Sequence, residues 1–179
     1  HSFPTRRSSD LKPPLSPDDK NAIPVKGLTM PAKALRMIDE IEFYIPDGGP
    51  AGLGFIRGVK WVDPDEWFFK AHFYQDPVCP GSLGIESFLQ LIKFMAMDRW
   101  GDRVRTHKFE MVTGKRHHWI YRGQIIQQNK RVEVEALVTD IRDAPDPVIF
   151  ANGYLKADGL YIYQMEDFGV VLRSQADIS

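Results

Sequence analysis

The chain has 179 residues, a formal net charge of −1 and an apolar fraction of 43%. This length predicts one domain with a single hydrophobic core, and the lack of a basic excess argues against a protein that binds nucleic acid. No apolar run is long enough to span a bilayer and Cys79 is the only cysteine, so we expect a cytoplasmic protein with no membrane segment and no internal disulfide.

The first 34 residues lack the pattern of a folded element. His1–Leu11 resembles translated sequencing-adapter DNA, and Lys12–Pro31 is rich in proline, serine and aspartate, a composition that breaks regular structure. We expect residues 1–34 to be a non-native start and a disordered proline-rich linker, residues 35–175 the domain, and residues 176–179 a tail. The linker fits either a domain from a longer protein or an ordinary disordered terminus.

The domain opens with two predicted strands, Arg36–Tyr44 and Gly54–Val62, separated by a turn rich in proline and glycine. The acidic segment Asp63–Glu66 then predicts a cap for a short helical turn that contains Trp67–Phe69. His72–Gly81 contains two prolines and a glycine at its end, so we expect an irregular loop there.

One long helix is predicted over Ser82–Trp100. Its apolar residues cover a broad arc at helical spacing, which indicates a helix that is buried on most sides. A polar stripe remains where Glu86 and Gln90 follow Ser82 at intervals of four residues, with Lys93 beside them.

Beyond this helix the sequence is rich in β-branched and aromatic residues, and Asp158-Gly159 is a hairpin signal. The predicted strands are Lys108–Val112, Trp119–Ile126, Arg131–Ile141, Val148–Ala157 and Leu160–Met165. Two strands, one buried helix and four or five further strands indicate an α+β fold in which an antiparallel sheet wraps around one helix.

Chemistry is concentrated between the predicted loop and the first turns of the helix. His72 and Glu86 have the side chains best suited to proton transfer near neutral pH. Gly81 and Ser82 would present backbone N–H groups at a helix N-terminus, where negative charge is favoured, and Gly81 would let a ligand approach the backbone closely. The segment therefore predicts an acid–base pair next to an oxyanion site.

The whole string His72–Gln90, HFYQDPVCPGSLGIESFLQ, resembles the active-site segment of the 3-hydroxyacyl-[acyl-carrier-protein] dehydratases of the FabA/FabZ group. The shared residues are His72, Phe73, Asp76, Pro77, Val78, Pro80, Gly81, Leu83, Gly84, Glu86 and Gln90. The flanking strings DPDEWFFKAHF and ADGLYIYQMEDFG resemble FabA-like dehydratase modules of polyunsaturated fatty acid and related polyketide synthases (PfaC-like). The resemblance covers nearly all of Leu35–Arg173 and implies a hot-dog fold.

The resemblance also implies a mechanism. His72 would remove the C2 proton, and Glu86 would orient and protonate the departing hydroxyl, or only position it while His72 transfers both protons. The Gly81 N–H would bind the thioester oxygen, and the Val78 carbonyl would fix the His72 tautomer. The substrate pocket would be formed by Ser82, Gln90, Phe73 and Pro80.

In this family the histidine and the acid come from two neighbouring hot dogs, so the resemblance implies a homodimer or pairing with an adjacent hot-dog domain. Acyl carrier protein would deliver the substrate on its phosphopantetheine arm, and no cofactor or metal is expected. Glu86 stands where the FabA branch has aspartate and the FabZ branch has glutamate, so trans-2 to cis-3 isomerase activity is not supported. Ser82 stands where FabA-type enzymes often have cysteine.

Several other interpretations compete with this one. His117-His118 suggests a metal site, but adjacent histidines on a strand point to opposite faces. Lys115-Arg116 could instead meet an acidic carrier protein or simply be solvated. Gly101–His107 (GDRVRTH) lacks the Asn-Pro of MaoC-type hydratases, and a thioesterase would not need His72. The main alternative is a non-catalytic hot-dog pseudo-domain with a structural or acyl-binding role in a synthase.

Overall fold

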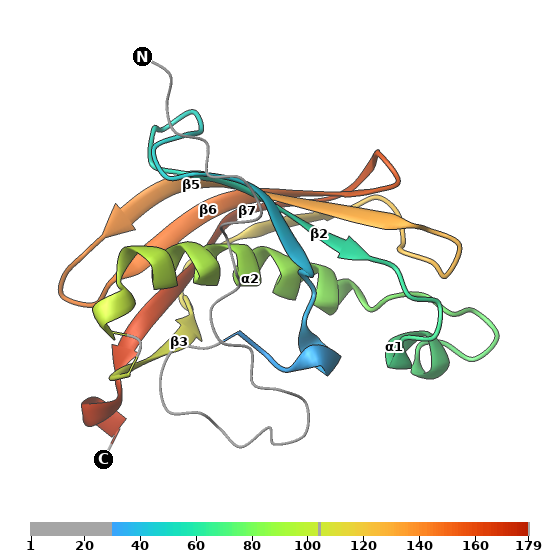
Figure 1. Ribbon diagram of the computed structural model, residues 1–179, viewed down its shortest axis with the longest axis horizontal. Coiled ribbons are helices and arrows are strands. Elements are labelled where there is room, and N and C mark those ends of the chain that lie inside the picture. The colour runs from blue at the N-terminus through green and yellow to red at the C-terminus, as the bar shows by residue number, and fades with distance from the viewer. Residues whose placement is uncertain (1–29, 104, 179) are drawn as a thin grey trace.

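The computed structural model describes residues 30–103 and 105–178. Its strands are β1 (Glu40–Ile45), β2 (Phe55–Trp61), β3 (His107–Met111), β4 (His118–Tyr121), β5 (Arg131–Arg142), β6 (Val148–Ala157) and β7 (Leu160–Ser174), and its α-helices are α1 (Trp67–Ala71) and α2 (Gly81–Arg99). The strands form one seven-stranded antiparallel sheet in the order β1-β2-β5-β6-β7-β3, with β4 also paired to β7. The sheet curls around α2 (Figure 1), which confirms the predicted α+β architecture.

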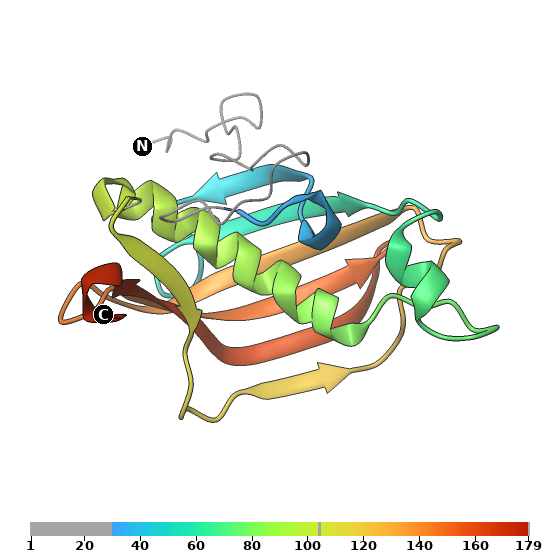
Figure 2. The ribbon, with the colours of Figure 1, turned by 90° about the horizontal axis from the view of Figure 1, so that it is seen from below.

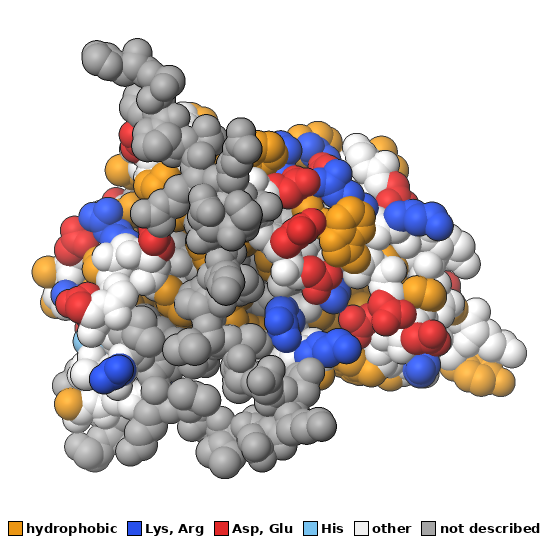
Figure 3. Space-filling view, viewed as in Figure 1, with side chains coloured by type: hydrophobic (Ala, Val, Ile, Leu, Met, Phe, Trp, Pro, Cys, Tyr) orange, Lys and Arg blue, Asp and Glu red, His pale blue; other side chains and the backbone are white. Residues whose placement is uncertain are grey.

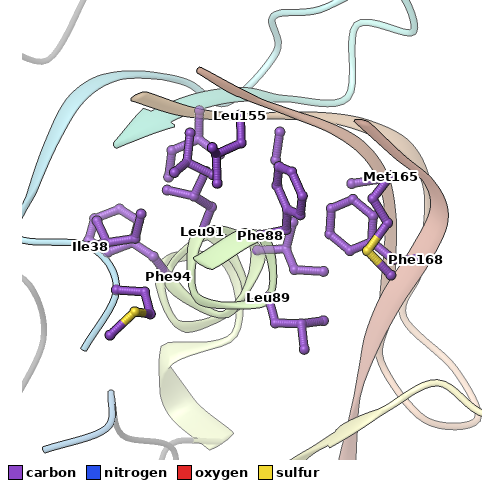
Figure 4. Packing of buried hydrophobic residues seen from close by; sticks show 14 of the residues in the cluster. Ile38, Phe88, Leu89, Leu91, Phe94, Leu155, Met165 and Phe168 are labelled. Carbon is purple, nitrogen blue, oxygen red and sulfur yellow. The ribbon is translucent and has the colours of Figure 1, made fainter. Parts of the chain in front are cut away.

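The helix α2 lies across one face of the sheet, while β1 and β4 lie at opposite edges (Figure 2). Most side chains of α2 are buried, and burying one large apolar side chain stabilises the folded state by about 1.5–3 kcal/mol. In a view along the helix, Phe88 and Leu91 point toward the sheet and Phe94 points toward Ile38 (Figure 4). The core therefore occupies the space between α2 and the concave face of the sheet.

The predicted strand Leu160–Met165 is too short. β7 continues to Ser174 and pairs with β6 and with both β3 and β4. Asp167 interrupts the regular pattern with a φ of 58°, and its N–H is held by Asn152 Oδ1 at 3.0 Å. β7 continues on both sides of this irregular residue. The alternating sequence pattern that predicts a strand is interrupted there, although the strand itself is not.

Two other strand predictions were misplaced. β1 begins at Glu40 rather than at Arg36, because the backbone N–H of Met37 donates to the side chain of Gln90 instead of to a strand. β4 ends at Tyr121 rather than at Ile126, because the chain then crosses to the loop before α2, where the Cys79 N–H donates to the Ile125 carbonyl at 2.8 Å.

The short helix α1 forms where it was predicted, but not with the predicted cap. Glu66 is its N-cap residue and makes no side-chain capping hydrogen bond. Asp63 instead accepts a hydrogen bond from the Asp65 N–H at 2.9 Å, which forms a turn before the helix.

The boundaries of the folded part also differ from the predicted ones. Met30 is 4% exposed and belongs to the core, and Lys33–Leu35 forms a 3₁₀ turn, so folded contacts begin before Leu35. Gln175–Ile178 forms another 3₁₀ turn in the predicted tail. The predicted start and linker over residues 1–29 lie outside the described residues.

Candidate active site

The loop between α1 and α2 holds the imidazole of His72 through its own backbone. The Val78 N–H donates to the His72 carbonyl at 2.8 Å, and His72 Nδ1 lies 3.1 Å from the Val78 carbonyl oxygen. Since a carbonyl can only accept a hydrogen bond, Nδ1 is the protonated nitrogen of the neutral ring. Nε2 is therefore the nitrogen that can accept a proton.

This loop is fixed from outside by the segment that follows β4. Val78 forms an isolated β-bridge with Ile126, next to the bond between the Cys79 N–H and the Ile125 carbonyl. The Cys79 side chain is 4% exposed, and burial, with the nearby Glu66 carboxylate, raises the pKa of its thiol to about 12. Cys79 is thus a packing residue and not a nucleophile.

Phe73 and Pro80 bracket the two ends of the loop. The ring of Phe73 lies on the ring of His72 with centroids 3.7 Å apart, yet Phe73 remains 58% exposed. Pro80 is the N-cap residue of α2 and provides no side-chain cap. Phe73 therefore contacts the His72 ring and is also open to solvent.

The N-terminus of α2 begins at Gly81, one residue before the predicted start. Its first N–H groups have no acceptor within the helix, so Gly81 and the exposed Ser82 offer donors for an anionic oxygen. Trp119 and Tyr121 of β4 cover the other side of Gly81, where a Cβ would lie 2.8 Å from Trp119 Cη2. A side chain at Gly81 would require the ring of Trp119 to move.

The carboxylate of Glu86 is held on α2 by two neighbours. Its Oε1 atom accepts a hydrogen bond from Gln90 Nε2 at 3.0 Å and pairs with Lys93 Nζ at 3.2 Å. Gln90 is fully buried, donates to the Leu35 carbonyl and accepts from the Met37 N–H, both at 2.8 Å. Glu86 is thereby tied, through Gln90, to the segment that leads into β1.

These contacts were only partly visible in the sequence. The polar stripe pointed to Gln90 and Lys93 as neighbours of Glu86, because residues near one another on a helix face recur at such spacings. The backbone groups of Leu35 and Met37, and the rings of Trp119 and Tyr121, have no signal in the sequence because they reach the site through the tertiary fold.

His72 and Glu86 have separate sets of polar contacts within one chain. Among residues 30–103 and 105–178, no hydrogen bond or ion pair joins His72 to Glu86. We call His72, Phe73, Val78 and Gly81 the histidine half-site, and Glu86, Gln90 and Lys93 the carboxylate half-site.

A narrow apolar cavity of about 30 Å³ lies beside the loop, between α1, the start of α2 and the sheet. Its wall includes Phe69, Cys79, Leu83, Ile125 and Leu155. A cavity of this size holds about one or two water molecules.

The histidines considered as metal ligands and the basic residues considered as a contact for a carrier protein lie outside both half-sites. Within the described part of the chain, no group of three His, Cys, Asp or Glu side chains is placed to hold a metal ion, and no helix there is long and apolar enough to cross a membrane.

Lys115 pairs with Asp167 at 3.1 Å and lies 4.2 Å from the centroid of the Phe150 ring. On the face shown in Figure 3, acidic and basic side chains are interspersed among the coloured atoms.

Solved structures share this fold. The hot-dog architecture is shared with the dehydratase heterocomplex ApeI:P from Xenorhabdus doucetiae, at a TM-score of 0.55 and 12% identity, with 82% of this chain and 88% of that chain covered. A probable thioesterase from Bartonella henselae has a TM-score of 0.47 and 9% identity, with 68% of this chain and 92% of that chain covered. At these identities the likeness to ApeI:P concerns the fold alone.

The sequence comparisons are more specific. One of the subunits of the polyunsaturated fatty acid synthase of a Thraustochytrium species is 40% identical over 144 residues, which are 76% of this chain and 9% of that protein. The chain thus spans about a tenth of the length of this curated relative. The model of the FabA-like domain matches residues 30–166, a range that includes both half-sites. The chain therefore belongs to the FabA-like domain family and is similar to part of a polyunsaturated fatty acid synthase subunit.

Proposed function

We propose that this domain removes water from a 3-hydroxyacyl thioester carried on acyl carrier protein and forms the trans-2-enoyl thioester. The observation that supports this most directly is the fixed imidazole of His72. Its Nδ1 donates to the Val78 carbonyl, which leaves Nε2 free to take the C2 proton. Membership of the FabA-like family supports the reaction class.

In the proposed reaction the C2–H bond breaks and its proton moves to His72 Nε2. The electrons form the C2–C3 double bond as the C3–O bond breaks, and the hydroxyl leaves as water after it receives a proton. Glu86 holds this hydroxyl and His72 or Glu86 supplies the proton, while the Gly81 N–H stabilises the negative charge on the thioester oxygen. These steps need no group beyond the side chains and backbone of the two half-sites.

Pairing of two hot dogs is part of this proposal. The histidine half-site of one chain would face the carboxylate half-site of a second copy or of an adjacent hot-dog domain in a synthase. Two observations support it: among the described residues no hydrogen bond or ion pair joins His72 to Glu86, and β4 at the sheet edge presents Trp119 and Tyr121 at 37% and 44% exposure. ApeI:P, which shares the fold, is itself a dehydratase heterocomplex.

The direct test is to incubate the chain with 3-hydroxyacyl carrier-protein thioesters of several chain lengths and to follow loss of water by mass spectrometry. We expect turnover by the parent and a loss of about 10²–10⁴-fold in both His72→Ala and Glu86→Gln. His117→Ala removes an exposed histidine outside both half-sites and should keep the parent rate. A folded, paired chain with no turnover at any chain length would instead favour the non-catalytic pseudo-domain.

Complementation tests the shared centre. Neither His72→Ala nor Glu86→Gln should turn over alone, but co-expression of both would form mixed pairs with one intact centre. Random pairing would restore about a quarter of the parent activity if the chain forms symmetric dimers. No recovery from a mixture shown to contain mixed pairs would mean that the centre does not combine half-sites from two chains.

A further inference from the structure

Both contacts of the Glu86 carboxylate are made to the same oxygen. Gln90 Nε2 and Lys93 Nζ lie 3.0 Å and 3.2 Å from Oε1. Among the described residues, Oε2 has no hydrogen-bond partner. A carboxylate held in this way is fixed in orientation and still has one oxygen free to contact a ligand.

Lys93 reaches Glu86 from an unusual distance along the helix. It lies seven residues after Glu86, whereas helical pairs usually join residues three or four apart. The Cα–Cβ bonds of a helix tilt toward its N-terminus, so the long lysine side chain can extend back along α2. Both side chains are only 19% exposed, and Glu86 is the only partner of Lys93 among the described residues.

The other contact is anchored as firmly. Gln90 is fully buried and its amide is bound to the backbone at Leu35 and Met37. An amide held on both sides cannot rotate to follow a moving carboxylate. Gln90 therefore fixes the place of Oε1, and Lys93 adds a second point of attachment that fixes the direction of Oε2.

We propose that Lys93 is a positioning residue of this dehydratase domain: it pairs with Oε1 of Glu86 and so directs Oε2 at the hydroxyl that leaves C3. The inference rests on the proposed function, in which Glu86 contacts that hydroxyl. Lys93 itself does not touch the substrate. Its removal should impair the chemical step more than substrate binding, because binding depends on the acyl chain and the thioester arm.

The test compares Lys93→Met, Lys93→Arg and the parent chain in steady-state dehydration of a 3-hydroxyacyl carrier-protein thioester. Lys93→Met should lower kcat by about ten- to a hundredfold, since a misplacement of about 1 Å can cost about 10²-fold, and change KM by less than about twofold. Lys93→Arg keeps the positive charge and should recover most of kcat. A purely structural lysine would show neither the split between kcat and KM nor the recovery by arginine.

A matched control lies at the other end of the same helix. Arg99→Met removes the exposed pair between Arg99 and Asp143 and should leave kcat unchanged. Thermal unfolding is recorded for every variant, and Lys93→Gln replaces Lys93→Met if the latter is not folded at the assay temperature.

The possible outcomes separate this inference from the proposed function. An active parent with full kcat in Lys93→Met, or an equal loss in Arg99→Met, would overturn the positioning role alone. A folded parent that dehydrates no substrate would overturn the proposed function and this inference together.

Discussion

The ring of Tyr163 occupies the space that a side chain at Gly84 would need. A Cβ at Gly84 would lie 2.2 Å from Tyr163 Cε2, a distance at which one of the two must move. Tyr163 is 2% exposed and stacks on Tyr121 with ring centroids 4.8 Å apart. The first turn of α2 therefore packs directly against the aromatic rings of the sheet.

We expect Gly84→Ala to destabilise the domain by about 1–3 kcal/mol, because forcing an extra methyl group into a packed core displaces its neighbours. Urea unfolding followed by tryptophan fluorescence measures the change. Gly101→Ala is the control, since a Cβ there would meet nothing within 4 Å, and it should alter stability by less than about 0.5 kcal/mol. Equal effects in the two variants would contradict close packing at Gly84.

Gln90→Met tests the buried amide that joins α2 to the start of the domain. The change keeps the volume but leaves the Met37 N–H and the Leu35 carbonyl without their partner, at an expected loss of about 1–3 kcal/mol in the free energy of unfolding. Gln127→Met is the comparison: its amide also donates to a backbone carbonyl, that of Pro64, but at the surface. Gln127→Met should lower the free energy of unfolding by less than about 0.5 kcal/mol. A larger loss in Gln127→Met than in Gln90→Met would contradict the stabilising role of the buried Gln90 amide.

Cys79 should not react with iodoacetamide at pH 8 while the protein is folded. Burial raises the pKa of its thiol to about 12, so the reactive thiolate is almost absent. Unfolding in urea should restore the ordinary pKa and allow full labelling, which intact-mass measurement detects. Because the chain has a single cysteine, fast labelling under native conditions would show directly that this site opens.

Asp158 should make stability depend on pH in the acidic range. Hydrogen bonds from the Asn129 side chain and from the Arg131 and Lys130 N–H groups lower the pKa of its carboxyl group. A carboxyl whose pKa is lowered by folding adds stability above its unfolded pKa, ~3.9, and this is lost as the pH falls through the folded value. Asp158→Asn should therefore be less stable than the parent at pH 7.

The difference between Asp158→Asn and the parent should shrink below pH ~3.9, as urea unfolding at pH 7 and pH 3 would show. Asparagine accepts the positive φ of 48° at this position, so the comparison is not confounded by backbone strain. A difference that grows on acidification would have the wrong sign for this mechanism.

Most of the architecture could be predicted because it depends on local patterns. The periodicity of Ser82–Trp100 placed α2 to within one residue at each end, and Asp158-Gly159 marked the hairpin between β6 and β7. The errors arose where a tertiary contact overrides the pattern. One example is Met37, whose N–H bonds to Gln90. Another is the segment beyond Arg122, whose N–H still donates to the Ile162 carbonyl of β7, before the chain meets the loop that precedes α2.

The candidate site, too, could be predicted where it depends on a local motif and not where it depends on tertiary contacts. The motif placed His72 and Glu86 in one segment, and the structure adds what holds each of them. The sequence could not reveal that their supports are separate, because Leu35 and Ile125 are distant from the motif along the chain. The roles of His72 and Glu86 in catalysis stay predictions until the variants are assayed.

The two half-sites are attached to different segments of the chain, and this has an evolutionary consequence. The histidine half-site depends on the segment after β4, and the carboxylate half-site depends on the segment before β1. If centres form between paired hot dogs, a gene duplication would leave each copy with one half that selection no longer needs. Each copy could then lose a different half by drift, so a tandem pair with a single complete centre is a short mutational path from this chain.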